Sequence, residues 1–207
     1  MKRKLLLILL TLTFGMSWFH ASAQIGIRTS YIKHSGDMGY LVKPSIGYEL
    51  LWGGSNIANK FYYGGSIGFF LLDTRLDTVP IGTFLDDDGV TLLPSYCVYE
   101  NMVEFTMGFN LEYKFLDKKF SPVIGTDIYF HVIEYDYIYH VPIIGGSDVT
   151  NKNIVTMGII PRLGVVYDLT ENITLEAGFG KSIAIDDTYE KYQYWKTYVG
   201  VVYFFNR

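Results

Sequence analysis

The chain has a single cysteine, Cys97, so no intramolecular disulfide can form and the fold must hold without one. No histidine or other base neighbours Cys97 in the sequence, which favours a small packing residue near the base of a loop over a reactive thiol. Beyond the N-terminal segment there is no run of 18 apolar residues, which excludes a transmembrane helix.

An excess of basic charge is also missing. The chain has 17 Lys and Arg against 21 Asp and Glu, and its formal charge is −4. Removing residues 1–23, which hold three bases and no acid, brings this to about −7. Nucleic acid is therefore excluded as a partner, because phosphate binding requires clustered Lys and Arg.

The N-terminus has the pattern of a secretory signal peptide. Lys2, Arg3 and Lys4 precede an apolar stretch that ends near Phe19, and the small residues of 20–23 follow. We predict Sec-dependent export, with cleavage before Gln24, so that residues 1–23 are the signal peptide and residues 24–207 form one domain. A retained N-terminal anchor helix is the alternative.

Aromatic residues and glycine are abundant. Aromatics make up 17% of the chain, and 21 glycines accompany them. In the clearest segment, Val103–Phe115, every odd position is apolar or aromatic and every even position is polar or glycine. A strand sends two such sets to opposite faces, whereas a helix would scatter them. Thirteen residues of alternation suit a tilted membrane crossing.

The same alternation recurs along the chain. It predicts eight strands, over residues 24–33, 39–51, 61–75, 97–115, 120–138, 153–169, 173–185 and 194–206. An even number of antiparallel strands can close into an up-and-down transmembrane β-barrel, which leaves no sheet edge unpaired in lipid. The predicted fold class is therefore an all-β, eight-stranded antiparallel barrel.

The connections alternate between short and long. Residues 116–119 and 170–172 are tight polar turns, which we assign to the periplasmic side together with both termini. The longer connections 76–96, 139–152 and 186–193 are then extracellular loops. We expect these loops to bind a protein partner, a surface glycan or lipopolysaccharide.

Two segments carry a resemblance to a known group of proteins. The turn region Tyr167–Gly178 and the closing strand Tyr198–Phe205, together with the signal peptide and strand count, resemble small outer-membrane barrels of the OmpA, OmpX and OmpW type. The resemblance implies an integral protein of the outer membrane of a Gram-negative bacterium. It also implies that Tyr203 and Phe205 form a C-terminal signal for the barrel assembly machinery, although Asn206 and Arg207 follow Phe205 here.

Strand facing separates a polar interior from a lipid-facing exterior. The predicted lipid-facing residues include Val103, Phe105, Met107, Phe109, Leu111, Val199 and Val201. The predicted interior charge network consists of Arg28, Lys43, Glu49, Glu104, Glu112, Lys114, Asp127, His131, Arg162, Asp168, Glu176 and Lys196. Eight strands enclose a lumen that side chains can fill, so we interpret these charges as a paired polar core; a proton or ion path is the alternative.

Residues for catalysis or metal binding are not indicated by any motif. His34-Ser35 and His140 lie near the predicted outer rim, where a lipid A-modifying enzyme would need Ser, His and an acid to converge, but the strand spacing gives no reason for convergence. Residues Asp86–Gly89 could hold Ca²⁺, although a solvated turn fits them better. We predict no cofactor, no metal site and no enzymatic activity.

The sequence therefore predicts an integral outer-membrane barrel with a structural or surface-interaction role. A narrow transport barrel for small solutes, similar to OmpW, is the first alternative, and the lipid-modifying enzyme is the second.

Overall fold

The computed structural model describes residues 22–56, 60–75, 78–85, 91–141, 146–185 and 193–205. Most of the predicted signal peptide and the acidic run Asp86–Gly89 lie outside the described residues. Within these ranges, no helix has both the length and the apolar character needed to cross a bilayer.

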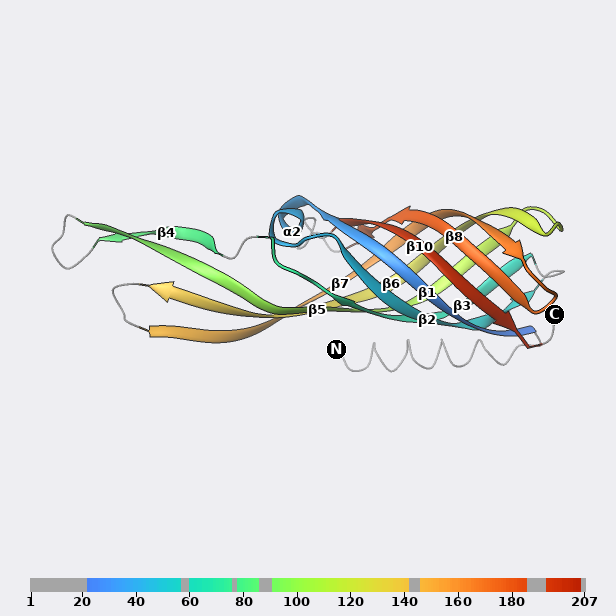
Figure 1. Ribbon diagram of the computed structural model, residues 1–207, viewed down its shortest axis with the longest axis horizontal. Coiled ribbons are helices and arrows are strands. Elements are labelled where there is room, and N and C mark those ends of the chain that lie inside the picture. Colours follow the sequence, from blue (N-terminus) through green and yellow to red (C-terminus); the bar gives the residue numbers. More distant parts are fainter. Residues whose placement is uncertain are drawn as a thin grey trace.

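The chain is almost entirely β-structure (Figure 1). The barrel strands are β1 (Ser22–Ser35), β2 (Ser45–Asn56), β3 (Phe61–Leu71), β5 (Leu92–Lys114), β6 (Phe120–Val141), β7 (Gly146–Asp168), β8 (Ile173–Lys181) and β10 (Gln193–Phe204). Three smaller elements accompany them, namely the helix α2 (Gly36–Leu41) and the strands β4 (Val79–Leu85) and β9 (Ile183–Ala184).

Two pairings close the barrel. The first strand β1 pairs antiparallel with the last strand β10, from Gln24 opposite Phe204 to Ser35 opposite Gln193. On the other side, β3 skips β4 and pairs with β5, from Phe61 opposite Tyr113 to Leu71 opposite Val103. The eight barrel strands thus form a closed antiparallel ring, which confirms the predicted fold class.

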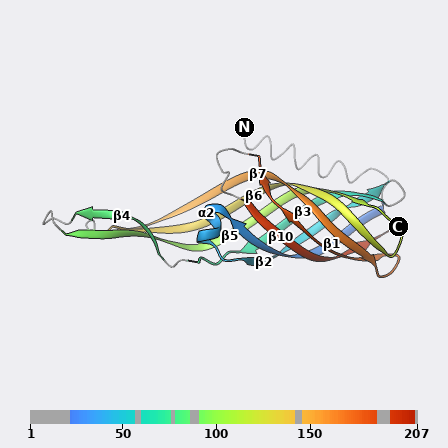
Figure 2. The ribbon, with the colours of Figure 1, turned by 90° about the horizontal axis from the view of Figure 1, so that it is seen from above.

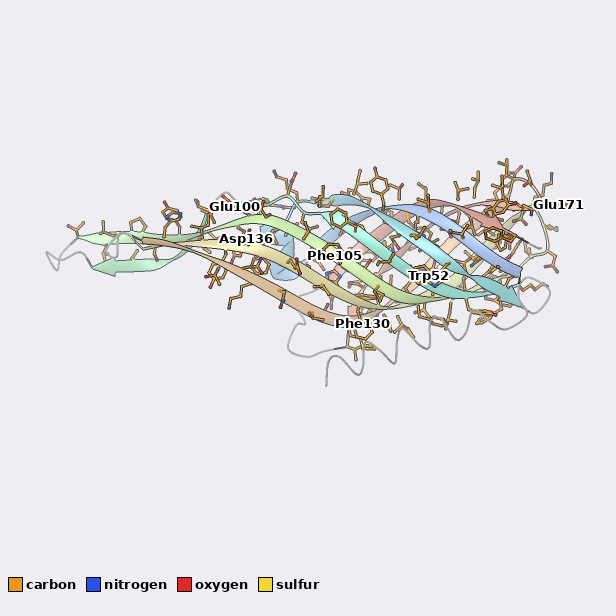
Figure 3. All side chains as sticks on the ribbon, turned by 90° about the horizontal axis from the view of Figure 1, so that it is seen from below. Trp52, Glu100, Phe105, Phe130, Asp136 and Glu171 are labelled. Atoms are coloured by element: carbon orange, nitrogen blue, oxygen red, sulfur yellow. The ribbon has the colours of Figure 1, made fainter. Side chains whose placement is uncertain are left out.

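The period-two alternation of the sequence corresponds to two faces of the barrel wall, one directed inward and the other outward. Inward residues of β1 such as Arg28 and Ser30 are buried, whereas the outward Ile27 is 62% exposed. An apolar exterior around a polar interior is the reverse of a soluble barrel and suits a lipid environment. Figure 3 shows outward side chains along the whole barrel wall. Exposed aromatics form a band at the tight-turn end: Tyr113, Phe115, Phe120, Tyr167, Tyr203 and Phe205.

Three strands continue far beyond the barrel. The strands β5, β6 and β7 have 23, 22 and 23 residues, about twice the 9–11 that a tilted membrane crossing needs. Their outer parts pair with one another, and β4 adds to the free side of β5. We call this four-stranded projection the outer sheet; it consists of β4 and of residues 92–101 of β5, 134–141 of β6 and 146–153 of β7. It protrudes from the barrel end opposite the C-terminus (Figures 1 and 2).

The outer sheet corrects part of the sequence interpretation. The segments 76–96 and 139–152 were expected to be loops, yet most of their described residues belong to β4, β5, β6 and β7. The segment 186–192 lies outside the described residues. The predicted second strand, 39–51, begins only at Ser45, because α2 occupies residues 36–41 at the barrel mouth.

The barrel interior is layered along its axis. A small apolar cluster of Leu51, Tyr62, Val202 and Phe204 lies nearest the tight turns. At the opposite mouth lies a larger apolar cluster that includes Met38 of α2, namely Ile32, Met38, Val42, Phe70, Leu72, Met102, Tyr129, Ile133, Ile160 and Tyr194. By strand register, Arg28, Glu49 and Glu176 lie in one layer between these two clusters.

Candidate functional site

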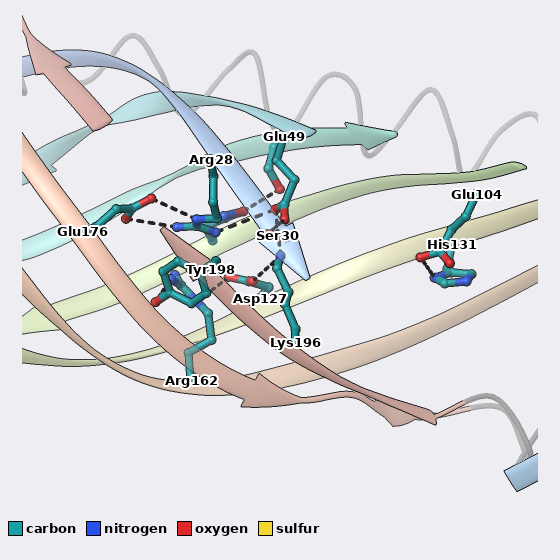
Figure 4. Close-up of polar contacts among 12 residues, drawn as sticks. Arg28, Ser30, Glu49, Glu104, Asp127, His131, Arg162, Glu176, Lys196 and Tyr198 are labelled. Atoms are coloured by element: carbon teal, nitrogen blue, oxygen red, sulfur yellow. Dashed lines mark hydrogen bonds and ion pairs between the residues drawn. The ribbon is translucent and has the colours of Figure 1, made fainter. Parts of the chain in front are cut away.

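Arg28 and Glu49 are the centre of a buried ion-pair network (Figure 4). The guanidinium of Arg28 donates two hydrogen bonds to Glu176, at 2.8 and 3.1 Å, and its Nη1 lies 3.7 Å from Glu49 Oε2. Glu49 also accepts hydrogen bonds from Ser30 and from Lys196, whose Nζ lies at 2.7 Å. These side chains come from β1, β2, β8 and β10, so the network ties together strands around the barrel.

Arg162 extends the network to the other wall. Its Nε lies 2.8 Å from Asp127 Oδ1 and its Nη1 lies 3.2 Å from Glu112 Oε2. The same Nη1 donates a 3.0 Å hydrogen bond to the hydroxyl of Tyr198, whose ring also lies 4.2 Å from the guanidinium carbon of Arg28. Each of these two buried arginines thus pairs with carboxylates and contacts the ring of Tyr198. A charge removed from water needs such an opposite charge beside it.

Inward glycines make room for these long side chains. A Cβ on Gly200 would lie 2.5 Å from Glu176 Oε1, and a Cβ on Gly158 would lie 2.6 Å from the Tyr129 hydroxyl. Larger residues there would push into the ion pairs or the aromatic packing. The glycines thus accommodate their neighbours rather than opening a channel.

A separate pair, Lys114 with Asp168, lies at the tight-turn end. The Lys114 Nζ is 2.7 Å from Asp168 Oδ2, and Thr174 donates a 2.8 Å hydrogen bond to the other carboxylate oxygen. Between this end and the central network is a cavity of about 50 Å³, lined in part by Arg28 and Glu176. That volume holds a few water molecules, not a continuous aqueous path.

A third polar group lies apart from the arginines, as Figure 4 shows for Glu104 and His131. His34 of β1, Glu104 of β5 and His131 of β6 are all buried. The His34 Nε2 lies 3.2 Å from Glu104 Oε2, and the His131 Nδ1 lies 3.3 Å from Glu104 Oε1. The ring of Tyr194 stacks on His131, with centroids 5.6 Å apart. We call His34, Glu104 and His131 the His-Glu-His cluster.

The interior of the barrel differs from the predicted network in two ways: it lacks Lys43, which was predicted to lie inside, and it contains His34, which was not. Lys43 is exposed and lies outside the strands, because the chain turns after α2 and Val42 bridges to Thr74 instead of entering the barrel wall. His34 was expected at the rim but faces inward. The signal for it was present in the sequence, since His34 continues the even-numbered inward series of Arg28 and Ser30 past the predicted end of that strand.

The other predicted interior residues all lie inside the barrel. Glu112 and Asp168 are half-buried, and the rest are buried: Arg28, Glu49, Glu104, Lys114, Asp127, His131, Arg162, Glu176 and Lys196. The predicted lipid-facing residues of β5 occupy the odd positions, opposite to the buried Met102 and Glu104. Val199 and Val201 are exposed on β10, as are Tyr203 and Phe205.

The outer sheet has its own polar contacts at its base. Asn101 and Asn151 both donate 3.0 Å side-chain hydrogen bonds to Asp136, which joins β5, β6 and β7. These two hydrogen bonds, that from Asn101 foremost, lower the pKa of Asp136. Asn101 has a φ of 51° and sits in a bulge between Glu100 and Val103. Asparagine tolerates this left-handed conformation better than most residues.

Further out, aromatic pairs cross the outer sheet. The rings of Tyr96 and His140 stack with centroids 4.7 Å apart, and those of Tyr99 and Tyr135 lie 5.6 Å apart. Cys97 is buried in this sheet, and burial raises the pKa of its thiol, which opposes formation of the reactive thiolate.

The residues considered for lipid modification are engaged in different places. The Ser35 hydroxyl donates to the Gln193 carbonyl at 3.0 Å, His34 lies beside Glu104, and His140 stacks on Tyr96. These contacts do not assemble a nucleophile, a base and an acid around one point, which such an enzyme requires.

Comparison with known proteins supports the architecture. No protein-family model matches the chain, and no curated protein sequence matches it. Among solved structures, the barrel resembles Neisserial surface protein A, with a TM-score of 0.53 and 13% identity over 88% of this chain and 97% of that one. The chain has the fold of the small outer-membrane β-barrels.

Two more solved structures are similar at lower scores. The attachment invasion locus protein Ail of Yersinia pestis has a TM-score of 0.47 and 14% identity over 89% of this chain and 97% of its own. The outer membrane protein OprG of Pseudomonas aeruginosa has a TM-score of 0.42 and 12% identity over 91% of this chain and 98% of its own.

Proposed function

We propose that this protein is an integral outer-membrane barrel of a Gram-negative cell that binds a protein partner at the cell surface through the outer sheet. The observation that carries the proposal is an open sheet edge outside the membrane. Among the described residues, Gly146–Asn153 of β7 pair with β6 on one side only, and β4 pairs only with β5. An unpaired edge can accept a strand from another chain.

The chemistry of this region favours a protein over an anionic glycan or lipopolysaccharide phosphate. Among the side chains that the structure describes, the outer sheet carries the acids Glu100, Glu134 and Asp136 and one Lys or Arg, Lys152, so its net negative charge repels phosphate and sulfate. Strand addition relies instead on backbone hydrogen bonds, and side chains such as the stacked Tyr96 and His140 supply selectivity.

The filled lumen argues against transport as the main role. Paired Arg, Lys, Glu and Asp side chains cross it in the middle, and the apolar cluster that contains Met38 of α2 lies toward the outer mouth. Opening a path would separate buried ion pairs, which is costly. A role outside the barrel therefore fits the arrangement better than a role through it.

Photo-crosslinking at the open edge tests the proposal. A photoreactive amino acid at Lys152 should give a discrete crosslinked protein in intact cells, whereas the same probe at Lys118, in the tight turn on the opposite side, should not. A shortened variant in which Asn-Gly replaces residues 137–150 would connect Asp136 to Asn151 through a two-residue turn, and these two residues face each other in β6 and β7. This variant should still fold and should lose the partner.

If the probe at Lys152 yields no crosslinked protein, or if the shortened barrel retains the same partner, the β7 edge of the outer sheet is not the binding surface.

A further inference from the structure

The His-Glu-His cluster joins three strands across the lumen. His34 comes from β1, while Glu104 and His131 come from the neighbouring strands β5 and β6 on the far side of the ring. Each residue offers one ligand atom, and these three atoms lie within 4.8 Å of one another. All three side chains are buried, with exposed fractions of 1% or less. Strand facing placed Glu104 and His131 inside the barrel, but the approach of the three side chains could not be read from sequence spacing, because about 70 residues separate His34 from Glu104.

We propose that this cluster is a binding site for a divalent transition-metal ion of the Zn²⁺ class. Two imidazoles and one carboxylate form a donor set typical of Zn²⁺, and imidazole also suits Cu²⁺, Ni²⁺ and Fe²⁺. With metal–ligand bonds of about 2.1 Å, tetrahedral geometry places ligand atoms about 3.4 Å apart. His34 Nε2 lies 3.2 Å from one carboxylate oxygen of Glu104 and His131 Nδ1 lies 3.3 Å from the other, while one ligand atom from each residue lies within 4.8 Å of the other two. Small side-chain rotations would therefore bring the three ligand atoms to tetrahedral spacing.

The net negative charge of the barrel interior favours a cation beside Glu104. Glu49, Glu176, Asp127 and Glu112 are each paired with Arg or Lys. Among the described residues, Glu104 forms ion pairs with histidines alone. The interior residues named above comprise four bases and six acids, so two negative charges remain. One divalent ion at Glu104 neutralises them, and this stabilises a carboxylate that burial would otherwise penalise.

The surroundings indicate a structural site. The apolar cluster that contains Met38 and Val42 surrounds the His-Glu-His cluster, with Ile32 next to His34 along β1 and both Tyr129 and Ile133 next to His131 along β6. Tyr194 packs on both imidazoles. An ion held there would link β1 to β5 and β6 across the barrel and would exchange slowly. We therefore expect the metal to enter while the barrel folds and to resist removal afterwards.

Metal analysis of the full chain tests the proposal. The protein is produced in outer membranes with a tag that contains no histidine, purified in detergent, and refolded from urea with and without Zn²⁺. After treatment with a chelator, the Zn²⁺-refolded barrel should retain about one ion per chain and should unfold at a higher temperature than the metal-free barrel. Refolding with Co²⁺ should give the visible absorption of a four-coordinate site with nitrogen ligands.

Matched variants locate the ion. Glu104→Gln and His131→Ala should each weaken Zn²⁺ binding by at least about 10-fold, the lower end of the loss seen when groups supporting a metal ligand are removed. His140→Ala, which removes a histidine of the outer sheet, should leave binding unchanged. Migration of unboiled samples on electrophoresis reports whether each variant has folded.

Two results would overturn the proposal. One is a folded wild-type barrel that takes up none of Zn²⁺, Co²⁺, Ni²⁺, Cu²⁺ or Fe²⁺ during refolding; the cluster is then a carboxylate hydrogen-bonded between two imidazoles. The other is metal binding that survives Glu104→Gln and His131→Ala but is lost in His140→Ala. The wild-type uptake decides the first even if the variants fail to fold.

Discussion

Replacing Arg28 with methionine should be among the most destabilising single changes in this barrel. Arg28 is 2% exposed and forms a bidentate pair with Glu176, a longer contact with Glu49 and a stacking contact with Tyr198. Methionine approximates the length of the side chain, so loss of volume is a minor part of the effect. The main cost in folding free energy comes from Glu176, which stays buried without its cation.

The expected magnitude follows from which partners retain a cation. Glu49 keeps Lys196 at 2.7 Å, but in the described part of the chain Glu176 has no other salt-bridge partner than Arg28. Leaving one buried charge without its partner costs about 3–5 kcal/mol. That corresponds to roughly two to four orders of magnitude in the folding equilibrium constant. Replacing Glu176 with glutamine as well should recover most of this loss, because no buried charge is then left unpaired.

Equilibrium unfolding in urea, with the barrel in lipid vesicles or detergent, measures these free energies. The single variants Arg28→Met and Glu176→Gln and their double variant form a cycle whose coupling energy isolates the pair. Lys118→Met in the exposed tight turn serves as the control and should change stability by less than about 0.5 kcal/mol. A cost for Arg28→Met below about 1 kcal/mol, or a double variant whose cost equals the sum of the single variants, would refute the paired-core reasoning.

Three other outcomes are expected. The purified barrel should show little or no steady conductance in planar bilayers, because ion pairs fill the lumen; reproducible ion-selective current that changes with Arg162→Ala would contradict this. Val201→Arg, at a residue 48% exposed on the outer face of β10, should cost about 2–4 kcal/mol in refolding, and the inward Thr106→Ala far less; equal costs would mean that the strand register is wrong. Because its folded-state pKa is lowered below 3.8, Asp136 should stabilise the base of the outer sheet above that pH, and the contribution should disappear as pH falls through the folded-state value. Protection of amides near Asn101 from hydrogen exchange, relative to their intrinsic exchange rate at each pH, measures this, and protection that does not fall with acid would contradict it.

Strand number and facing were predictable from the sequence because they depend on local chemistry. Side chains alternate between faces with a period of two, so the odd and even positions of Val103–Phe115 separate into lipid-facing and interior sets without any knowledge of neighbouring strands. The same reasoning placed Arg28, Glu49 and Arg162 inside the barrel. It also indicated that those charges pair, since eight strands leave little room for water.

The pairing partners and the outer sheet depended on tertiary structure. Period two shows which face a side chain occupies, but not which residue lies opposite, so the approach of His34 to Glu104 and His131 follows only from ring closure through β1 with β10 and β3 with β5. The predicted strand 97–115 already crosses the bulge at Asn101, but the extension of β5 to Leu92 and its pairing with β4 follow only from the tertiary structure. Lys43 has the odd-numbered position of the inward residues of β2, yet it is exposed outside the strands because α2 turns the chain before β2 begins. The alternation of apolar and polar residues is a property of each segment by itself. Strand register and barrel closure arise only when distant segments form hydrogen bonds with one another.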